Sequence, residues 1–351
     1  MTHPLTRLAL AALLAVAGFL LPTLLGGSTL VYDTLVAIAI FSAMSYGLDV
    51  ILSDLGEISL VHTAFFATGA YAAAILTVTY GFGAWTALAG AVLAALSLAL
   101  VLGLITLRTR EFAFSLVTYA AAVVCMNIAS NWDFLGGSDG IVGIPPLDLS
   151  IGPLELTAGR SVEFWPFAYV LLLLTLYVVH RFRRSRLGQA ALMVHMNPRL
   201  ATMCGLDGNR IRLQVFLLSA VISAAAGWLY AFQRAYVGTD LFETYFLVLM
   251  LTGVILAGRR ILLGPLLGTA LLLSQKSFAS LGAYGDKLVL GVILVAVLCL
   301  CPRGLASLGP KVRGFKHRPA RSNAQAHAQS HAPAAADVAT AKIPAASTRH
   351  A

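Results

Sequence analysis

The feature that most constrains this chain is a series of long apolar segments separated by short polar ones. The segments cover residues 8–25, 30–52, 58–80, 84–107, 112–130, 164–181, 213–235, 243–257, 262–280 and 286–301. An α-helix rises about 1.5 Å per residue, so about 20 apolar residues cross the roughly 30 Å hydrocarbon core of a bilayer. Lipid offers no partner for backbone N–H and C=O groups, and a helix pairs these groups internally. The pattern therefore predicts an all-α integral membrane protein with about ten transmembrane helices.

The composition supports this class. The chain has 351 residues, of which 59% are hydrophobic and 11% are charged, whereas about 25% of the residues in an ordinary soluble domain are charged. Its formal net charge is +9. The basic residues cluster beside apolar segments rather than among exposed aromatic residues, so we expect contact with membrane lipid and none with nucleic acid.

The longest basic segment between apolar ones runs from His180 to Leu213. It contains seven arginines and a single acidic residue, Asp207. Basic loops between membrane spans stay on the cytoplasmic side. With this loop inside, the arginines and lysines of the other turns also fall inside, and the acidic segment 131–163 falls outside. We therefore expect a multi-pass protein with both termini in the cytoplasm.

A short helix is predicted inside this basic loop. Asn197 can cap its start, Pro198 fits its first position, and Gly205 fits the position just past its end. Leu200, Met203 and Cys204 then share one face, and an apolar face on a short cytoplasmic helix needs something to cover it. Two interpretations remain open: the face docks a protein partner, or it lies on its own bundle or on lipid headgroups.

Four ionisable residues lie within or beside the second and third apolar segments: Asp49, Asp54, Glu57 and His62. Ionisable residues in membrane segments are costly and mark candidate functional sites. Glycines and small polar residues around them would let a helix break and neighbouring backbones approach, as in transporters with sites near the middle of the membrane. The alternative is that Asp54 and Glu57 sit in a hydrated cytoplasmic turn and that His62 only packs.

Signatures of nucleotide binding, zinc hydrolysis and thiol catalysis are missing from the sequence. It contains no GxxxxGK[ST], HExxH or CxxC motif, and we expect no enzyme activity, no catalytic residue, no metal site and no cofactor. A membrane-embedded enzyme would need converging nucleophilic or metal-binding residues, and the sequence suggests none.

The composition changes near residue 307, where alanine, histidine, serine, proline and glutamine become frequent. Such a segment cannot bury enough apolar surface to offset the entropy of ordering. We expect a transmembrane domain over residues 1–306, with the cytoplasmic loop at 182–212, and a disordered cytoplasmic tail over residues 307–351.

Several ordered blocks of the sequence resemble the branched-chain amino acid ABC transporter permeases of the LivM type. GEISLVHTAFFATGAYAAA, starting at Gly56, looks like the family's G-Q-I-S-L-G-H-A-A-F-F-G-I-G-A-Y block, and GGSDGIVGIPP, starting at Gly136, looks like its external G-G-S-D-G-L-x-G-I-P segment. The basic loop with the helix that follows it, LLGPLLGTALL and CPRGL match further blocks of the family. The similarity extends from about residue 32 to residue 305.

This resemblance implies a function and a set of partners. It suggests a membrane subunit of an ATP-driven importer of leucine, isoleucine, valine or similar amino acids in a bacterial inner membrane. The expected partners are a second permease subunit in a heterodimer, two cytoplasmic ATP-binding subunits that hydrolyse ATP, and an external or periplasmic substrate-binding protein. An importer permease of the same type for urea, short amides or other amino acids is an alternative. An ion-coupled secondary transporter is another, although the capped loop helix argues against it.

The resemblance also suggests site residues. The candidates for coupling to the ATPase are Leu187, Gly188, Asn197, Pro198, Leu200, Met203 and Gly205. Together with the ionisable residue Glu57, the candidates for the translocation pathway are Gly56, Ser59, His62, Phe65, Gly69 and Tyr71.

Some positions depart from the family pattern. Glu57 stands where glutamine is usual, Asp49 where asparagine is common, and Arg259 and Arg260 where a Gly-Leu-Gly-Ser turn is usual. These added charges leave the identity of the transported amino acid or amide open.

Overall fold

The computed structural model describes residues 13, 15–106, 109, 111–150, 156–258 and 260–278, and a few isolated positions between 285 and 295. The chain separates into two compact units, Met1–Gly309 and Pro310–Ala351, and the described residues belong to the first. The elements are α2 (Leu21–Leu24), α3 (Thr29–Asp54), α4 (His62–Ala74), the π-helix η1 (Ile75–Thr79), α5 (Ala84–Thr106), α6 (Glu111–Asn131), η2 (Asp133–Leu135), β1 (Ile141–Val142), β2 (Leu147–Asp148), β3 (Thr157–Ala158), α7 (Ser161–Arg184), α8 (Arg186–Met196), α9 (Pro198–Met203), α10 (Gly208–Arg234), β4 (Tyr236–Val237), η3 (Thr239–Phe242), α11 (Thr244–Ala257) and α12 (Gly264–Phe278).

The prediction of a mostly helical protein is confirmed. Among the described residues, α3, α5, α6, α7 and α10 are long and apolar enough to cross a membrane, and α11 and α12 are shorter apolar helices. Helix α4 continues into η1 over the segment predicted at 58–80. The count of ten spans and the side of each terminus remain predictions, because most of the last apolar segment and part of the first lie outside the described residues. So does the predicted tail, 307–351.

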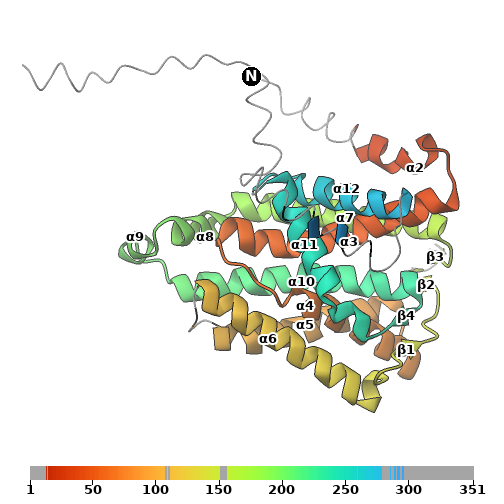
Figure 1. Ribbon diagram of the computed structural model, residues 1–351, viewed down its shortest axis with the longest axis horizontal. Helices are drawn as coiled ribbons and strands as arrows, with labels where there is room; N and C mark the ends of the chain where they lie inside the picture. Colours follow the sequence, from red (N-terminus) through yellow and green to blue (C-terminus); the bar gives the residue numbers. More distant parts are fainter. Residues whose placement is uncertain are drawn as a thin grey trace, which may run out of the picture. The chain divides into compact units, whose positions relative to one another are not determined.

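Two helices form the centre of the bundle. Helix α3 contacts α7, α10, α11 and α12, and α10 contacts α3, α4 and α5. Every residue from Ile38 to Asp54 is buried. A helix that is apolar all round and buried on all sides is expected at the centre of a membrane bundle, and Figure 1 shows α3 and α10 running through its middle.

Helix α5 buries small side chains and exposes large apolar ones, as expected for a helix that faces lipid. Its buried positions repeat every four residues and carry small side chains: Ala87, Ala91, Ala95, Ala99 and Gly103. Large apolar side chains such as Leu93, which is 66% exposed, and Val101 point away from the protein. Small residues let membrane helices approach closely, whereas large exposed apolar side chains would be unfavourable in water. The outer face of α5 therefore suits contact with acyl chains.

Close backbone contacts also join α4 to α10 and α11 to α12. A side chain added at Gly69 would overlap the backbone of Ala224, and one added at Gly227 would overlap the carbonyl of Phe66. Likewise, Gly268 lies directly against the backbone of Gly253. Glycine permits these approaches because it has no Cβ.

The segment with the sequence GGSDGIVGIPP forms turns rather than a span, as predicted. Gly136, Gly140 and Gly143 all have positive φ, and β1 pairs antiparallel with β4, with Ile141 opposite Val237. In Figure 1 the short strands gather at one end of the bundle, and α8 and α9 lie at the other.

Candidate functional site

The predicted short helix in the basic loop is confirmed as α9. The side chain of Asn197 accepts a hydrogen bond from the Leu200 N–H at 3.0 Å, Pro198 is the first helical residue, and Gly205 follows with φ of +79°. The side-chain oxygen of Asn197 accepts a hydrogen bond from the first turn, and the fixed φ of Pro198 suits the first helical position. Gly205 adopts the left-handed conformation just after the end of the helix, which is favourable for glycine. The sequence therefore determines both ends of α9.

The preceding helix, α8, is fixed in a similar way. The Ser185 hydroxyl accepts a hydrogen bond from the Gly188 N–H at 3.2 Å. A side chain at position 188 would overlap the carbonyl of Phe182 at the end of α7, so the turn from α7 into α8 needs a glycine there. Leu187, next to it, is partly buried against the core. Helix α8 is thus tied to the end of α7, and α9 packs against α8 and α10.

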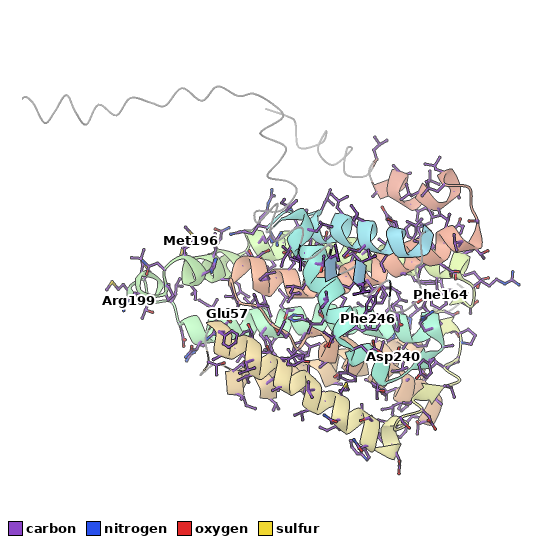
Figure 2. The ribbon with its side chains drawn as sticks, in the orientation of Figure 1. Glu57, Phe164, Met196, Arg199, Asp240 and Phe246 are labelled. Atoms are coloured by element: carbon purple, nitrogen blue, oxygen red, sulfur yellow. The ribbon has the colours of Figure 1, made fainter. Side chains whose placement is uncertain are left out.

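An apolar surface covers the outer side of these two helices. We call Met193, Met196, Leu200 and Met203 the loop patch. Their exposed fractions are 53%, 77%, 57% and 84%, respectively. Met196 and Arg199 lie at the extreme end of the bundle in Figure 2. The interpretation in which α9 buries its apolar face on its own bundle is therefore wrong for the described chain.

The chain breaks between α3 and α4, directly beside these loop helices. Gly56 has φ of +72°, and a side chain there would overlap the His195 ring of α8. The extended segment that follows is tied to α6, because the Leu60 N–H donates to Thr118 Oγ1 at 3.1 Å and Ser115 Oγ donates to the Ile58 carbonyl at 2.7 Å. A cavity of about 720 Å³ lies between the break and the loop, lined in part by Gly56, Glu57, His195, Pro198 and Arg212.

Glu57 forms an ion pair across this cavity. The Arg212 Nη2 atom lies 2.7 Å from Glu57 Oε1 and donates to the Thr109 carbonyl at 2.9 Å. The guanidinium group also lies over the Phe114 ring, 5.7 Å from its centroid. The side chains of Arg212 and Glu57 are 8% and 16% exposed, so a largely buried ion pair in the wall of this cavity links the helix break to the start of α10. In Figure 2, Glu57 lies toward the end that carries Met196 and Arg199.

A second group of charges lies at the end of α3. The guanidinium of Arg183 contacts Asp49 at 2.6 Å and Asp54 at 3.2 Å, and Arg260 Nε lies 3.4 Å from Asp54. The side chains of Asp49 and Asp54 are 1% and 0% exposed. We call these four residues the charge cluster; it joins α3, α7 and the turn before α12. The interpretation of Asp54 as a residue of a hydrated turn is therefore wrong.

Arg183 and Arg212 were not singled out from the sequence. Each lies among the many arginines of the basic loop, whose number was explained by topology. The available signal was the presence of Asp49, Asp54 and Glu57 in the apolar segment 30–52 and just after it, since buried acids in membrane segments need cationic partners.

The remaining predicted pathway residues lie on α4 or just before it and are buried. His62 and Phe65 are fully buried, and their rings meet edge to face at 5.7 Å. Within the described chain, Ser59 Oγ and the Tyr71 hydroxyl make no hydrogen bond, and the ring nitrogens of His62 face the backbone of Ser59 and Gly47 without a well-formed one. Buried polar atoms are normally paired. These side chains therefore add polar groups to the largely apolar interior beside α4.

The outer end of α4 meets η3. The rings of Tyr71 and Phe242 lie 6.3 Å apart. Burial raises the pKa of the nearby Asp240 carboxyl above its ordinary value, and the Glu243 carboxylate acts in the same direction. Among the described residues, no group of three or more His, Cys, Asp or Glu side chains could hold a metal ion.

Apolar spans, buried polar groups beside a helix break and an exposed apolar loop patch define a class, the membrane-spanning subunits of transporters, or permeases. The chain belongs to the branched-chain amino acid transport system / permease component family, which it matches over residues 30–298.

Two relatives are both described as the high-affinity branched-chain amino acid transport system permease protein LivM. The protein from Escherichia coli (strain K12) is 29% identical over 287 residues, covering 76% of this chain and 67% of that protein. The protein from Salmonella typhimurium is 28% identical over the same shares. Among solved structures, PsaBC from Streptococcus pneumoniae in complex with Fab matches with a TM-score of 0.44 and 13% identity, covering 85% of this chain and 99% of that one.

Proposed function

We propose that this chain is one of two membrane subunits of an ATP-driven importer of leucine, isoleucine and valine in a bacterial inner membrane. Its partners are then a second permease subunit, two cytoplasmic ATP-binding subunits and an external substrate-binding protein. Membership of the permease family supports the transport role, and the similarity to two LivM permeases of branched-chain amino acid transport systems supports these substrates.

The observation that carries this proposal is the loop patch. A permease without a nucleotide-binding motif needs a contact with a separate motor, and a pair of firmly held helices ending in exposed methionines and a leucine is suited to that contact. Methionine is flexible and polarisable, so it adapts to a partner surface. Leu187, Gly188, Asn197, Pro198 and Gly205 then position the helices, and Leu200 and Met203 touch the ATPase.

The interior beside α4 is the proposed pathway. A zwitterion crossing a membrane protein needs polar groups that replace its water. Ser59, His62 and Tyr71 offer buried polar atoms, Gly69 brings α4 close to α10, and Phe65 packs beside His62. Gly56 and Glu57 lie at the end of this route beside the loop helices, which is a suitable position for a gate linked to the motor.

The test is uptake of radiolabelled leucine, isoleucine and valine. Deleting the gene should abolish ATP-dependent uptake, and the reconstituted transporter should need ATP and its ATP-binding subunits. Accumulation driven by an ion gradient through the purified chain alone would contradict the proposal. Uptake of urea or a short amide in place of these amino acids would retain the importer and change its substrate.

A further inference from the structure

A second cavity lies at the end of the bundle opposite to α8 and α9. Its volume is about 500 Å³, within the roughly 300 to 1,000 Å³ of sites for small molecules. It is formed near the start of α3, α7 and α11 and the end of α10. The distribution of arginines predicts that this end is external. In Figure 2, Phe246, which lines the cavity, lies toward this half of the bundle, well away from Glu57.

The inner part of this cavity is apolar and aromatic. The rings of Phe41 and Phe246 are stacked with centroids 5.4 Å apart, and Tyr230 meets Phe41 edge to face at 5.7 Å. Phe41 and Tyr230 are 7% and 6% exposed, and Leu249 and Leu273 add aliphatic wall. Such a floor suits a branched aliphatic group.

The mouth of the cavity carries one charge of each sign. Asp33 lies on the first turns of α3 and accepts a hydrogen bond from the Ser161 hydroxyl at the start of α7. Arg234 ends α10, and its Nε atom lies 3.4 Å from the Tyr230 hydroxyl. Both charged residues are exposed, whereas Phe41 and Tyr230 of the floor are buried and Phe246 is partly buried. A free α-amino acid has the same pattern: two opposite charges at one end and an apolar side chain at the other.

We propose that this cavity is a binding site for free α-amino acids with branched apolar side chains, occupied before the pathway along α4. The carboxylate of the ligand pairs with Arg234, whose guanidinium can donate two parallel hydrogen bonds. The ammonium group pairs with Asp33, and the side chain packs on Phe41, Phe246 and Leu249. The assignment of branched-chain amino acids as the ligands rests on the proposed function. The requirement for a ligand that carries both charges rests on Asp33 and Arg234 at the mouth of the cavity.

The proposal sets an order of affinities. Each buried CH₂ group contributes about fourfold, so leucine should bind more tightly than valine, and valine more tightly than alanine. Leucinamide lacks the carboxylate and 4-methylpentanoate lacks the ammonium group, so each loses one of the two ion pairs with the site. We expect each to bind about tenfold or more weakly than leucine.

The experiment measures binding of radiolabelled leucine to the purified whole transporter without its binding protein, with the analogues as competitors. Arg234→Gln should weaken leucine about tenfold or more and remove its advantage over leucinamide. Asp33→Asn should weaken leucine similarly and remove its advantage over 4-methylpentanoate. Arg234→Lys and Asp33→Glu keep the charges and should restore most of the discrimination.

A control variant and an assembly measurement separate recognition from structure. Asp133→Asn removes an exposed acid of η2, outside this cavity. It should bind leucine like the unmodified protein, and all variants should still assemble with the partner subunits.

The outcomes distinguish this site from the proposed function. If ATP-driven leucine uptake is present but no saturable site is found, or if both charge variants discriminate the analogues normally, the cavity proposal is wrong and the importer stands. Loss of binding in Asp133→Asn equal to that in Asp33→Asn would also overturn it. Charge-dependent binding of leucine without any leucine uptake would support the cavity and reject the importer of branched-chain amino acids.

Discussion

Three of the charged residues that depart from the pattern of LivM-type permeases, Asp49, Glu57 and Arg260, each pair with an opposite charge. Asp49 pairs with Arg183, Glu57 pairs with Arg212, and Arg260 pairs with Asp54. Within these pairs the added charges cancel locally. They therefore act first on the closure of the bundle near the loop helices, and they do not present a net charge to a substrate.

Arg260 illustrates how such a departure is tolerated. It has φ of +63°, a conformation in which a glycine would fit without strain. Its N–H donates to Ser53 Oγ at 3.1 Å, and its guanidinium reaches Asp54. Ser53 also donates to Asp49 at 2.5 Å. These contacts offset the backbone strain, which is on the order of 1 kcal/mol.

We expect Arg183→Gln to destabilise the protein strongly, because it leaves Asp49 and Asp54 buried without their shared cation. Removing one partner of a buried ion pair costs about 3 to 5 kcal/mol. Asp49→Asn should cost less, since Arg183 keeps Asp54. The thermal midpoint of the purified protein in detergent measures both. Equal midpoints for the two variants would contradict the assignment of Arg183 as the centre of the charge cluster.

Glu57→Gln introduces the residue usual in the family and leaves Arg212 buried without its carboxylate. Assembly should be retained, because Arg212 keeps the Thr109 carbonyl and the Phe114 ring. The rate or selectivity of leucine uptake should change, with a loss equivalent to about 1 to 3 kcal/mol. Arg212→Gln in the same chain should recover part of it. Additive effects of the two substitutions would mean that the pair does not act as a unit.

At the scale of the elements, the features best predicted from the sequence are those set by local backbone chemistry or by the length of an apolar segment. The caps of α9 and the turn glycines follow from local backbone chemistry, and the apolar lengths predicted the helices. The pairing of Arg183 and Arg212 with acids of another helix depends on contacts between residues more than 125 positions apart, which no local pattern contains. The second cavity could not be predicted from the sequence for the same reason, because its lining residues come from five helices.

The loop patch leads to a prediction about α9 as an element. Changing Leu200 or Met203 to Asp should weaken co-purification of the ATP-binding subunits, because a charge buried in an apolar interface costs about 2 to 4 kcal/mol. Thr202→Asp is the matched control on the same helix, since Thr202 lies outside the loop patch. The permease itself should still insert and purify. Unchanged assembly in both variants would favour a patch that rests on lipid headgroups.

At the scale of the whole molecule, the two ends of the bundle differ in chemistry. One end carries the loop patch, the charge cluster and the Glu57–Arg212 pair, and the other carries the short strands and the cavity with Asp33 and Arg234. An importer needs this polarity, because substrate arrives at one face and the motor acts at the opposite one. Which end faces the cytoplasm has been inferred from charge alone.

This orientation can be tested with cysteines at the two ends. Cys204, in the basic loop, is exposed, and Ser150, between the short strands, is exposed as well. In a chain whose other cysteines are replaced by alanine, a membrane-impermeant thiol reagent added to intact cells should label Ser150→Cys and leave Cys204 unlabelled. In inverted vesicles the result should reverse, because the seven arginines of the loop hold it in the cytoplasm. Labelling of both positions from one face would overturn the orientation, and with it the placement of the loop patch on the side of the ATP-binding subunits.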